Sequence, residues 1–487
     1  MTSVRRALAL SMAERYVLIA LSLLSNILIA RLLTPEEIGI FSVTLALIGI
    51  AHVLRDFGIG NFLIQEKTLN DDHVRTAFGF SLVIGVGLFV LIFTIAPWAG
   101  VFYKDPRIVD TIRIGALNFL VLPFCSISVA LLRREMQFGR LAVVTLGAAA
   151  FGFAVTITLA LQGFGANGLA IGGVAGNLAT GLGAWLARTP RRILMPGFRE
   201  WRKVVGFGAR TSAANIVTTI SLDINDLAVG RILGFAPVAM ISRAQGLMNL
   251  FHRDLMTAIR NVAYPAYARS HREGGDLEAQ HVFTVATITV LAWPFYAFAA
   301  LYALELLRLL FGPQWDEAAP LVPWFCLAGA AAATCNLILP LLTARGRVDL
   351  ATRADLVVQP IRAAVLVVGV LLFQNMLSFA VLFALIFIAA VPYLYHIKAQ
   401  EQPTDFPELF AKLRKSLAVT AACMAPPVCI AALAPSGGTP GALAAMGLSA
   451  ALCAVTWVAA AIFFRHPITD DPLFRRLVGT VGLRPGT

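Results

Sequence analysis

Long apolar stretches alternate with short polar connections along almost the whole chain. A helix that crosses about 30 Å of hydrocarbon needs about 20 mostly apolar residues. Fourteen stretches meet this description, and the seventh and eighth contain the most polar residues. We therefore predict membrane-spanning helices at residues 12–33, 38–56, 76–98, 108–132, 141–161, 165–187, 207–232, 237–267, 281–310, 319–343, 350–372, 376–397, 416–434 and 441–464.

The connections between these stretches are short. The two longest, residues 57–75 and 398–415, each have about 18 residues, which leaves no room for an extramembrane domain. Thr34-Pro35-Glu36-Glu37 combines an N-cap residue, a first-turn proline and two acids, which is typical of a helix start. The basic N-terminus precedes an apolar stretch that is too long for a signal peptide, so we predict a retained first span.

The composition supports a membrane protein. Hydrophobic residues make up 58% of the 487 residues and charged residues 14%, against roughly 25% charged in soluble domains. A soluble enzyme, a disulfide-rich secreted scaffold and a disordered protein are therefore excluded. The six cysteines lie in apolar stretches without CxxC spacing, and the GxGxxG string at 163–168 follows no strand, so we predict neither metal nor cofactor.

The charge balance indicates topology. There are 39 Lys and Arg against 27 Asp and Glu, a net charge of +12 that would suggest nucleic acid in a soluble protein. With the N-terminus placed in the cytoplasm, 26 basic residues fall in cytoplasmic segments, 4 on the opposite side and 9 inside spans. This asymmetry predicts cytoplasmic termini, an even number of spans and no nucleic-acid partner.

A short internal repeat indicates two halves. At a constant offset of 200 residues, Arg31 matches Arg231, Leu33 matches Leu233 and Ser42 matches Ser242. We predict an all-α polytopic membrane protein with two parallel-repeat six-helix lobes around a central cavity. The predicted segments are an N-lobe at 1–203, a C-lobe at 204–398, and two last helices with a cytoplasmic tail at 399–487.

Charged residues inside the spans are the candidates for function. An ionised group in mid-bilayer costs at least about 2.5–3.5 kcal/mol, so it usually faces a partner or a water-filled cavity. Helical spacing aligns several of them, and arginine is suited to a bidentate contact with phosphate or diphosphate. The candidate anion-binding cations are Arg15, Arg210, Arg253, Arg260 and Arg362, with the polar cavity residues Asn26, Asn225, Asn249 and Gln359.

Each candidate also has a purely structural interpretation. Asp223 and Asp226 are candidates for coupling a cation or proton, or they pair with arginine or bind water. Arg15, Arg31 and Arg231 can extend from a span end toward the interface. Simple ion pairs would account for Arg253, for Arg362 with Asp355, and for Glu305 with Arg308.

Several strings resemble bacterial polysaccharide flippases. They are residues 30–41 (ARLLTPEEIGIF), 55–60 (RDFGIG), 63–65 (LIQ), 132–138 (LRREMQF) and 311–315 (FGPQW) with Ala318. In order and position they are similar to the Wzx colanic-acid or exopolysaccharide branch of the multidrug/oligosaccharidyl-lipid/polysaccharide exporter superfamily. The similarity covers spans 1–10, and it places Arg31 and the Arg55–Asp56 pair on matching motif positions.

The resemblance implies fourteen spans in two lobes around a central cavity. It also implies alternating-access translocation of a lipid-linked oligosaccharide, typically on undecaprenyl diphosphate, across the inner membrane. Exopolysaccharide or lipopolysaccharide synthesis would be the context, with polysaccharide polymerase and export proteins as partners and no enzymatic activity. The cavity arginines come from the spacing argument, and charge reversal at Arg253 is predicted to abolish transport without preventing insertion.

Other functions remain as alternatives. A multidrug or metabolite antiporter of the same superfamily would favour acidic cavity residues, whereas the intramembrane excess here is basic. A membrane glycosyltransferase or polymerase acting on the same carrier would have a large external loop, but the longest outward connection, residues 99–107, is short. A channel would need a re-entrant filter segment, and the sequence contains no such pattern.

Overall fold

The computed structural model describes residues 2–56, 59–188, 195–199, 219–433, 440–471 and 474–475. Within these ranges, the side chains are described for all residues except 2–13, 15, 54, 56 and 440. The described part of the chain contains helices and turns but no β-strand. It divides by its internal contacts into two compact units, Met1–Ala239 and Met240–Thr487.

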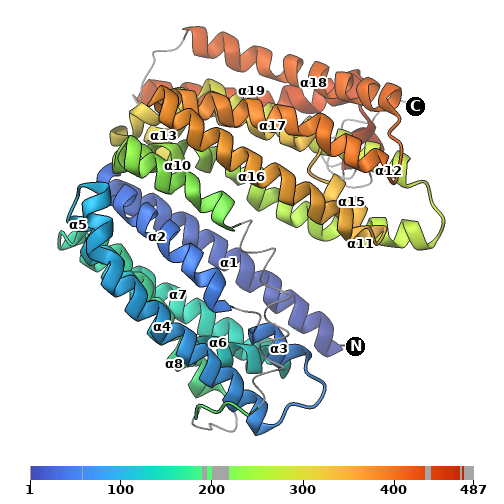
Figure 1. Ribbon diagram of the computed structural model, residues 1–487. Helices are drawn as coiled ribbons and strands as arrows, with labels where there is room; N and C mark the ends of the chain where they lie inside the picture. Colours follow the sequence, from blue (N-terminus) through green and yellow to red (C-terminus); the bar gives the residue numbers. More distant parts are fainter. Residues whose placement is uncertain are drawn as a thin grey trace. The chain divides into compact units, whose positions relative to one another are not determined.

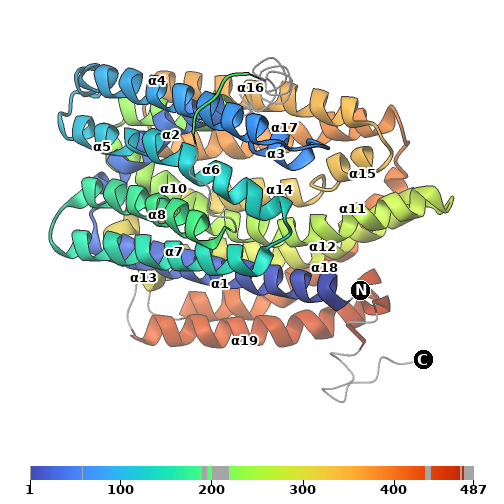
Figure 2. The same ribbon diagram turned by 90° about the horizontal axis from the view of Figure 1, so that it is seen from below.

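The first unit consists of antiparallel helices joined by short turns (Figure 1). A further helix at 219–232 and the first residues of α10 (Phe235–Asn249) also belong to it. The remaining helices of this unit are α1 (Thr2–Leu32), α2 (Pro35–Asp56), α3 (Ile59–Gln65), α4 (Asp71–Tyr103), α5 (Arg107–Ala116), α6 (Asn118–Arg134), α7 (Phe138–Leu161) and α8 (Gly165–Ala187). Figure 2 shows α6, α7 and α8 running side by side.

The second unit contains two departures from a regular α-helix. A π-helix, η1 (Leu250–Leu255), continues α10, and a turn at 334–337 separates two helices within one span. The remaining elements are α11 (Met256–Arg272), α12 (Leu277–Leu301), α13 (Ala303–Leu310), the 3₁₀ helix η2 (Pro313–Leu321), α14 (Val322–Ala333), α15 (Ile338–Ala344), α16 (Val348–Phe373), α17 (Met376–Ala399), α18 (Phe406–Leu433), α19 (Pro440–Phe463) and the 3₁₀ helix η3 (Pro467–Asp470).

The predicted helical membrane architecture is confirmed. Within the described residues, eleven helical segments are long and apolar enough to cross a membrane, which makes the chain a multi-pass membrane protein. They correspond to the second to sixth and ninth to fourteenth predicted spans. The first span has a shorter apolar helix, Tyr16–Leu32, and the seventh lies partly outside the described residues. The count of fourteen and the three-segment division stay predictions.

The TPEE string forms the corner between α1 and α2. Thr34 and Glu37 cap the helix reciprocally, because the Glu37 carboxylate accepts from the Thr34 N–H at 2.8 Å and the Glu37 N–H donates to Thr34 Oγ1 at 3.3 Å. Arg107 contacts both Glu36 and Asp105 at 2.6 Å, and its hydrogen bonds hold the pKa of Asp105 below the usual range. The acids of this motif therefore stabilise a turn.

The FGPQW string also forms a structural corner. Gly312 has a φ of 103°, which favours glycine, and it precedes the 3₁₀ helix η2. Trp315 is fully buried, and the Arg243 guanidinium lies 5.1 Å from the ring centroids of both Phe311 and Trp315. Arg308, predicted to pair with Glu305, forms a two-pronged ion pair with Asp316, with 2.8 Å between Nε and Oδ1.

Buried polar contacts join the connections of the second unit. Lys398, at the end of α17, is fully buried and forms an ion pair with Glu278 at the start of α12. Its Nζ also donates to Thr404 Oγ1 at 2.8 Å. Close to this pair in the chain, Glu401 accepts ion pairs from Arg345 and Arg347. These contacts join three connections of the unit.

His466 anchors the last two long helices to α12. Its Nδ1 accepts the Ile468 N–H at 3.1 Å, so its Nε2 carries the proton and lies 3.0 Å from Ser416 Oγ of α18. Ser416 in turn lies 3.0 Å from Thr289 Oγ1 of α12. His466 is fully buried, and burial lowers its pKa to about 4. The ring is therefore neutral at physiological pH.

Candidate functional site

In the first unit, the predicted acidic pair lies on the helix at 219–232. A Cβ added to Gly49 of α2 would lie 2.6 Å from Asp223 Oδ2, so the absent side chain lets this carboxylate approach α2. Asp226 follows one turn later on the same helix. This placement brings an acid against a neighbouring span, and its role in ion coupling stays a prediction.

The other first-unit candidates are dispersed. Asn26 is exposed, and Asn225 is buried, with its Nδ2 3.4 Å from the Ser221 carbonyl oxygen. The Oδ1 of Asn225 is buried and accepts no hydrogen bond from any residue that the structure describes. Arg210 and the Arg15 side chain lie outside the described residues. Their predicted contacts with substrate therefore remain untested.

The second unit encloses a cavity of about 270 Å³ with polar side chains on its wall. Three predicted site residues, Arg260, Gln359 and Arg362, line it together. Apolar side chains of α14, α15, α16 and α17 complete the wall. The polar and charged lining residues are His252, Arg260, Asn336, Asp355, Gln359 and Arg362.

The interruption between α14 and α15 shapes one wall of the cavity. α14 ends at Ala333 and α15 begins at Ile338, so the four residues between them leave the regular helix inside a membrane span. The freed Thr334 carbonyl accepts a hydrogen bond from Tyr395 Oη of α17 at 2.7 Å. Asn336 Nδ2 lies 3.5 Å from His252 Nδ1. Interrupted helices of this kind commonly form binding sites in transporters.

Arg362 is the most buried cation of this cavity wall. The residue is 9% exposed, its guanidinium lies 5.6 Å from the Phe387 ring centroid, and its Nε has no hydrogen-bond acceptor in the described part of the chain. Among the described residues, no carboxylate lies within 4.0 Å of it. Asp355, two turns earlier on α16, shares the cavity without forming the predicted ion pair.

The π-helix decides which residues of the eighth predicted span reach the cavity. A π-turn holds more residues than an α-turn, so it rotates the faces that follow away from simple 3.6-residue spacing. His252 lines the cavity, whereas Arg253 is 70% exposed and pairs with Asp254 at 2.9 Å. Asn249 ends α10 without lining the cavity. Spacing could not identify His252 because it assumed one regular helix.

The cavity is chemically suited to an anion. Two guanidinium groups and one carboxylate line it, and Arg260 donates a 3.3 Å hydrogen bond to Thr257 Oγ1. The Asn336 amide and the His252 ring add groups that can donate hydrogen bonds. Charge-assisted hydrogen bonds from arginine to phosphate oxygens are strong in such a desolvated setting.

Comparison with known proteins gives the family. The model of a family described as polysaccharide biosynthesis protein matches residues 28–320, more than half of the chain. The chain belongs to this family. The resemblance seen in the sequence is thereby confirmed, and the TPEE and FGPQW strings both lie inside the matched region.

Individual relatives agree with this assignment. The chain is 24% identical over 340 residues to the lipopolysaccharide biosynthesis protein WzxC of Escherichia coli (strain K12), covering 69% of this chain and 68% of that protein. It is 23% identical over 323 residues to the succinoglycan biosynthesis transport protein ExoT of Rhizobium meliloti (strain 1021), covering 66% and 65%. Its fold is similar to that of the lipid II flippase MurJ in an inward closed conformation, with a TM-score of 0.73, 12% identity and coverage of 94% and 99%.

Proposed function

We propose that this protein translocates a lipid-linked oligosaccharide, carried on a prenyl diphosphate, across the bacterial inner membrane. The product would enter exopolysaccharide or lipopolysaccharide synthesis. Membership of the polysaccharide biosynthesis family supports this, as do relatives named for lipopolysaccharide synthesis and succinoglycan transport. A flippase forms no covalent bond with its substrate, so this function requires binding groups and conformational change but no catalytic residue.

The cavity of the second unit is the observation that carries the proposal. Burying the Arg362 guanidinium beside a single shared carboxylate is costly unless an anion arrives. A diphosphate group would supply that anion, with Arg362 and Arg260 donating to its oxygens.

Transport would follow from the differential stability of two conformations. Binding of the diphosphate head group offsets the desolvation cost of the buried arginines. It thereby shifts the protein toward the conformation that is closed on the side from which the substrate entered. The lobes then open to the other side, as in alternating access. The proposal includes cytoplasmic termini, which the distribution of Lys and Arg supports, and polymerase or export proteins as downstream partners.

Deletion of the gene followed by lipid extraction and surface-glycan analysis tests the function. We expect loss of one surface polysaccharide and accumulation of its lipid-linked repeat unit on the cytoplasmic side. If the gene is expressed, an unchanged glycan profile with lower drug tolerance would replace the proposal with the antiporter alternative.

Complementation of the deletion tests the cavity. Arg362→Gln should insert normally but restore less than a tenth of the polysaccharide, since one charge-assisted contact contributes about 1.5–3 kcal/mol. Arg353→Gln, on the exposed face of the same helix, is the matched control and should restore it fully. Equal complementation by the two variants would remove Arg362 from the site. Arg253→Glu tests, in the same assay, the predicted contact between this exposed arginine and the substrate.

A further inference from the structure

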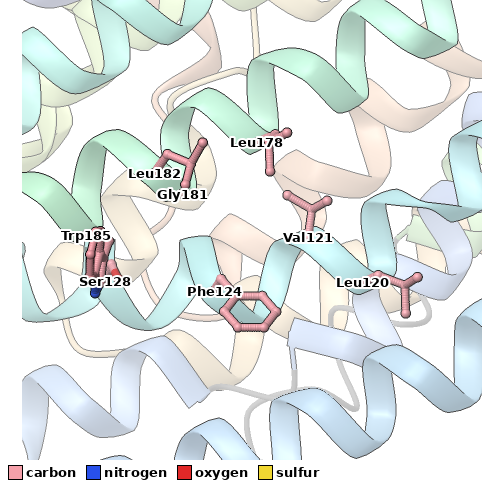
Figure 3. A pocket seen from close by; sticks show the side chains of 8 residues that line it. All are labelled: Leu120, Val121, Phe124, Ser128, Leu178, Gly181, Leu182 and Trp185. Atoms are coloured by element: carbon pink, nitrogen blue, oxygen red, sulfur yellow. The ribbon is translucent and has the colours of Figure 1, made fainter. Parts of the chain in front are cut away.

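An apolar groove of about 370 Å³ lies between α6 and α8 in the first unit. Figure 3 shows the two helices contributing facing side chains along its length, with Leu120 at one end and Trp185 with Ser128 at the other. The helices approach closely at Gly181, where an added Cβ would lie 2.7 Å from Cys125 Sγ. The lining residues are Leu120, Val121, Phe124, Ser128, Leu178, Gly181, Leu182 and Trp185.

Two buried polar atoms near the Trp185 end have no hydrogen-bond partner in the part of the chain that the structure describes. Ser128 is fully buried, lines the groove, and its Oγ has no partner among the described residues. Arg188, which follows α8 three residues after Trp185, is 9% exposed, and its Nη1 has no acceptor within the described ranges. Burial lowers the pKa of Arg188, and the nearby Glu135 only partly opposes this effect.

The other cations at this helix end are engaged differently. Arg134 donates to the Leu63 carbonyl oxygen at 2.7 Å, and Arg140 donates to the Ala187 carbonyl oxygen at 3.1 Å. Glu135 accepts a 2.7 Å hydrogen bond from Gln137. The end of α8 therefore combines excess positive charge with a buried guanidinium that an anionic group could complete.

We propose that the α6–α8 groove binds one chain of an anionic phospholipid, whose phosphate is held by Arg188. Charge complementarity favours this occupant over a zwitterionic lipid, because the latter brings its own cation to the basic cluster. Arg133, Arg134 and Arg188 fall on the predicted cytoplasmic side, so the lipid would come from that leaflet.

The length of the groove suits a phospholipid chain better than the substrate's prenyl tail. Its α6 lining runs from Leu120 to Ser128, which is about 12 Å at a rise of about 1.5 Å per residue. A groove of this length takes a large part of an ordinary acyl chain and only a small fraction of a long polyprenyl chain. Trp185, an aromatic residue at the basic end, is typical of the level where chains meet head groups.

The test measures quenching of tryptophan fluorescence in the purified full-length protein. Brominated phosphatidylglycerol and brominated phosphatidylcholine are titrated separately in detergent, and a Trp185→Phe variant identifies the signal from the groove. We expect the phosphatidylglycerol to bind at least about tenfold more tightly, a difference that one phosphate–arginine contact supplies.

Three variants give the proposal its decisive outcomes. Arg188→Gln should reduce the preference for phosphatidylglycerol to near one, Arg188→Lys should keep most of it, and Leu182→Phe should weaken both lipids by filling the groove. Arg199→Gln is the control, since that side chain is 84% exposed and pairs with Asp72. An unchanged preference in Arg188→Gln would overturn the proposal.

A competition experiment distinguishes a prenyl lipid from a phospholipid as the occupant of the groove. Undecaprenyl phosphate that displaces brominated phosphatidylglycerol at lower concentration than unlabelled phosphatidylglycerol would make this a substrate site and overturn the proposal. Weaker competition supports it. Neither measurement requires transport, so the outcome is independent of the proposed flippase function.

Discussion

The buried pair of Lys398 and Glu278 allows a quantitative prediction. The Lys398 side chain is 0% exposed, and the Glu278 side chain is 16% exposed. Lys398→Met would leave the Glu278 carboxylate, among described partners, with the Asp405 N–H, whose nitrogen lies 3.2 Å from Oε1. Removing one partner of a buried pair typically costs about 3–5 kcal/mol. Because water can reach Glu278 in part, we expect Lys398→Met to lower the free energy of unfolding by about 3 kcal/mol, the lower end of this range.

The control is an ion pair close by in the chain. Lys412 and Glu408 are 2.6 Å apart at i,i+4 spacing, and Glu408 is 42% exposed, so Lys412→Met should cost only about 0.3–0.5 kcal/mol. Thermal unfolding of the detergent-purified proteins, followed by tryptophan fluorescence, gives the comparison. The double variant Lys398→Met/Glu278→Gln should recover much of the loss, because no unpaired charge remains buried.

Two outcomes would refute this reasoning. Lys398→Met could lower the unfolding midpoint no more than Lys412→Met does, which would mean that Lys398 is hydrated in solution. Alternatively, the double variant could be no more stable than Lys398→Met alone. The pair would then contribute by packing of its side chains and not by charge.

Two further predictions concern other contacts. Gly39→Ala should lower the unfolding midpoint by the equivalent of about 1–3 kcal/mol, because its Cβ would lie 1.9 Å from the backbone carbonyl oxygen of Phe235, which cannot rotate away as a side chain can. A wild-type midpoint for Gly39→Ala would contradict this close approach. The folded pKa of His466, about 4, lies below the usual value near 6.5, so its contribution to stability is full above about pH 6.5 and is lost as the pH falls toward 4. His466→Gln should show a flatter midpoint across this interval in the same unfolding assay, and parallel pH profiles would exclude His466 as the titrating group.

Hydropathy was sufficient to predict the helical membrane fold, because a segment of about 20 apolar residues can cross the bilayer whatever the rest of the chain does. The predicted boundaries agree closely with most helices; for example, the sixth predicted span, 165–187, coincides with α8. Local turn chemistry was equally readable. The Thr34–Glu37 corner forms the predicted cap because all its interacting groups are close in sequence.

The site was only partly predictable because it depends on departures from helical regularity. The α14–α15 break and the π-helix η1 both lie inside segments that a 20-residue average treats as uniform. Spacing placed Gln359 and Arg362 on one face of the regular helix α16, and both line the cavity. It selected Arg253 on the eighth predicted span, where His252 lines the cavity instead. Likewise, Lys398 counted as a loop charge until its contact with Glu278, 120 positions away, was visible.

The polar composition of α10 and α11 has a consequence for biogenesis. Arg243, Arg253, Asp254 and Arg260 all lie between the start of α10 and the middle of α11, and each charged residue near a span centre opposes insertion by about 2.5–3.5 kcal/mol. As an isolated helix, this segment would therefore pass from the translocon into lipid at a high free-energy cost. We expect it to be held there until neighbouring apolar helices emerge and shield it, so that the ribosome must synthesise part of the second unit before this helical segment can settle in the bilayer.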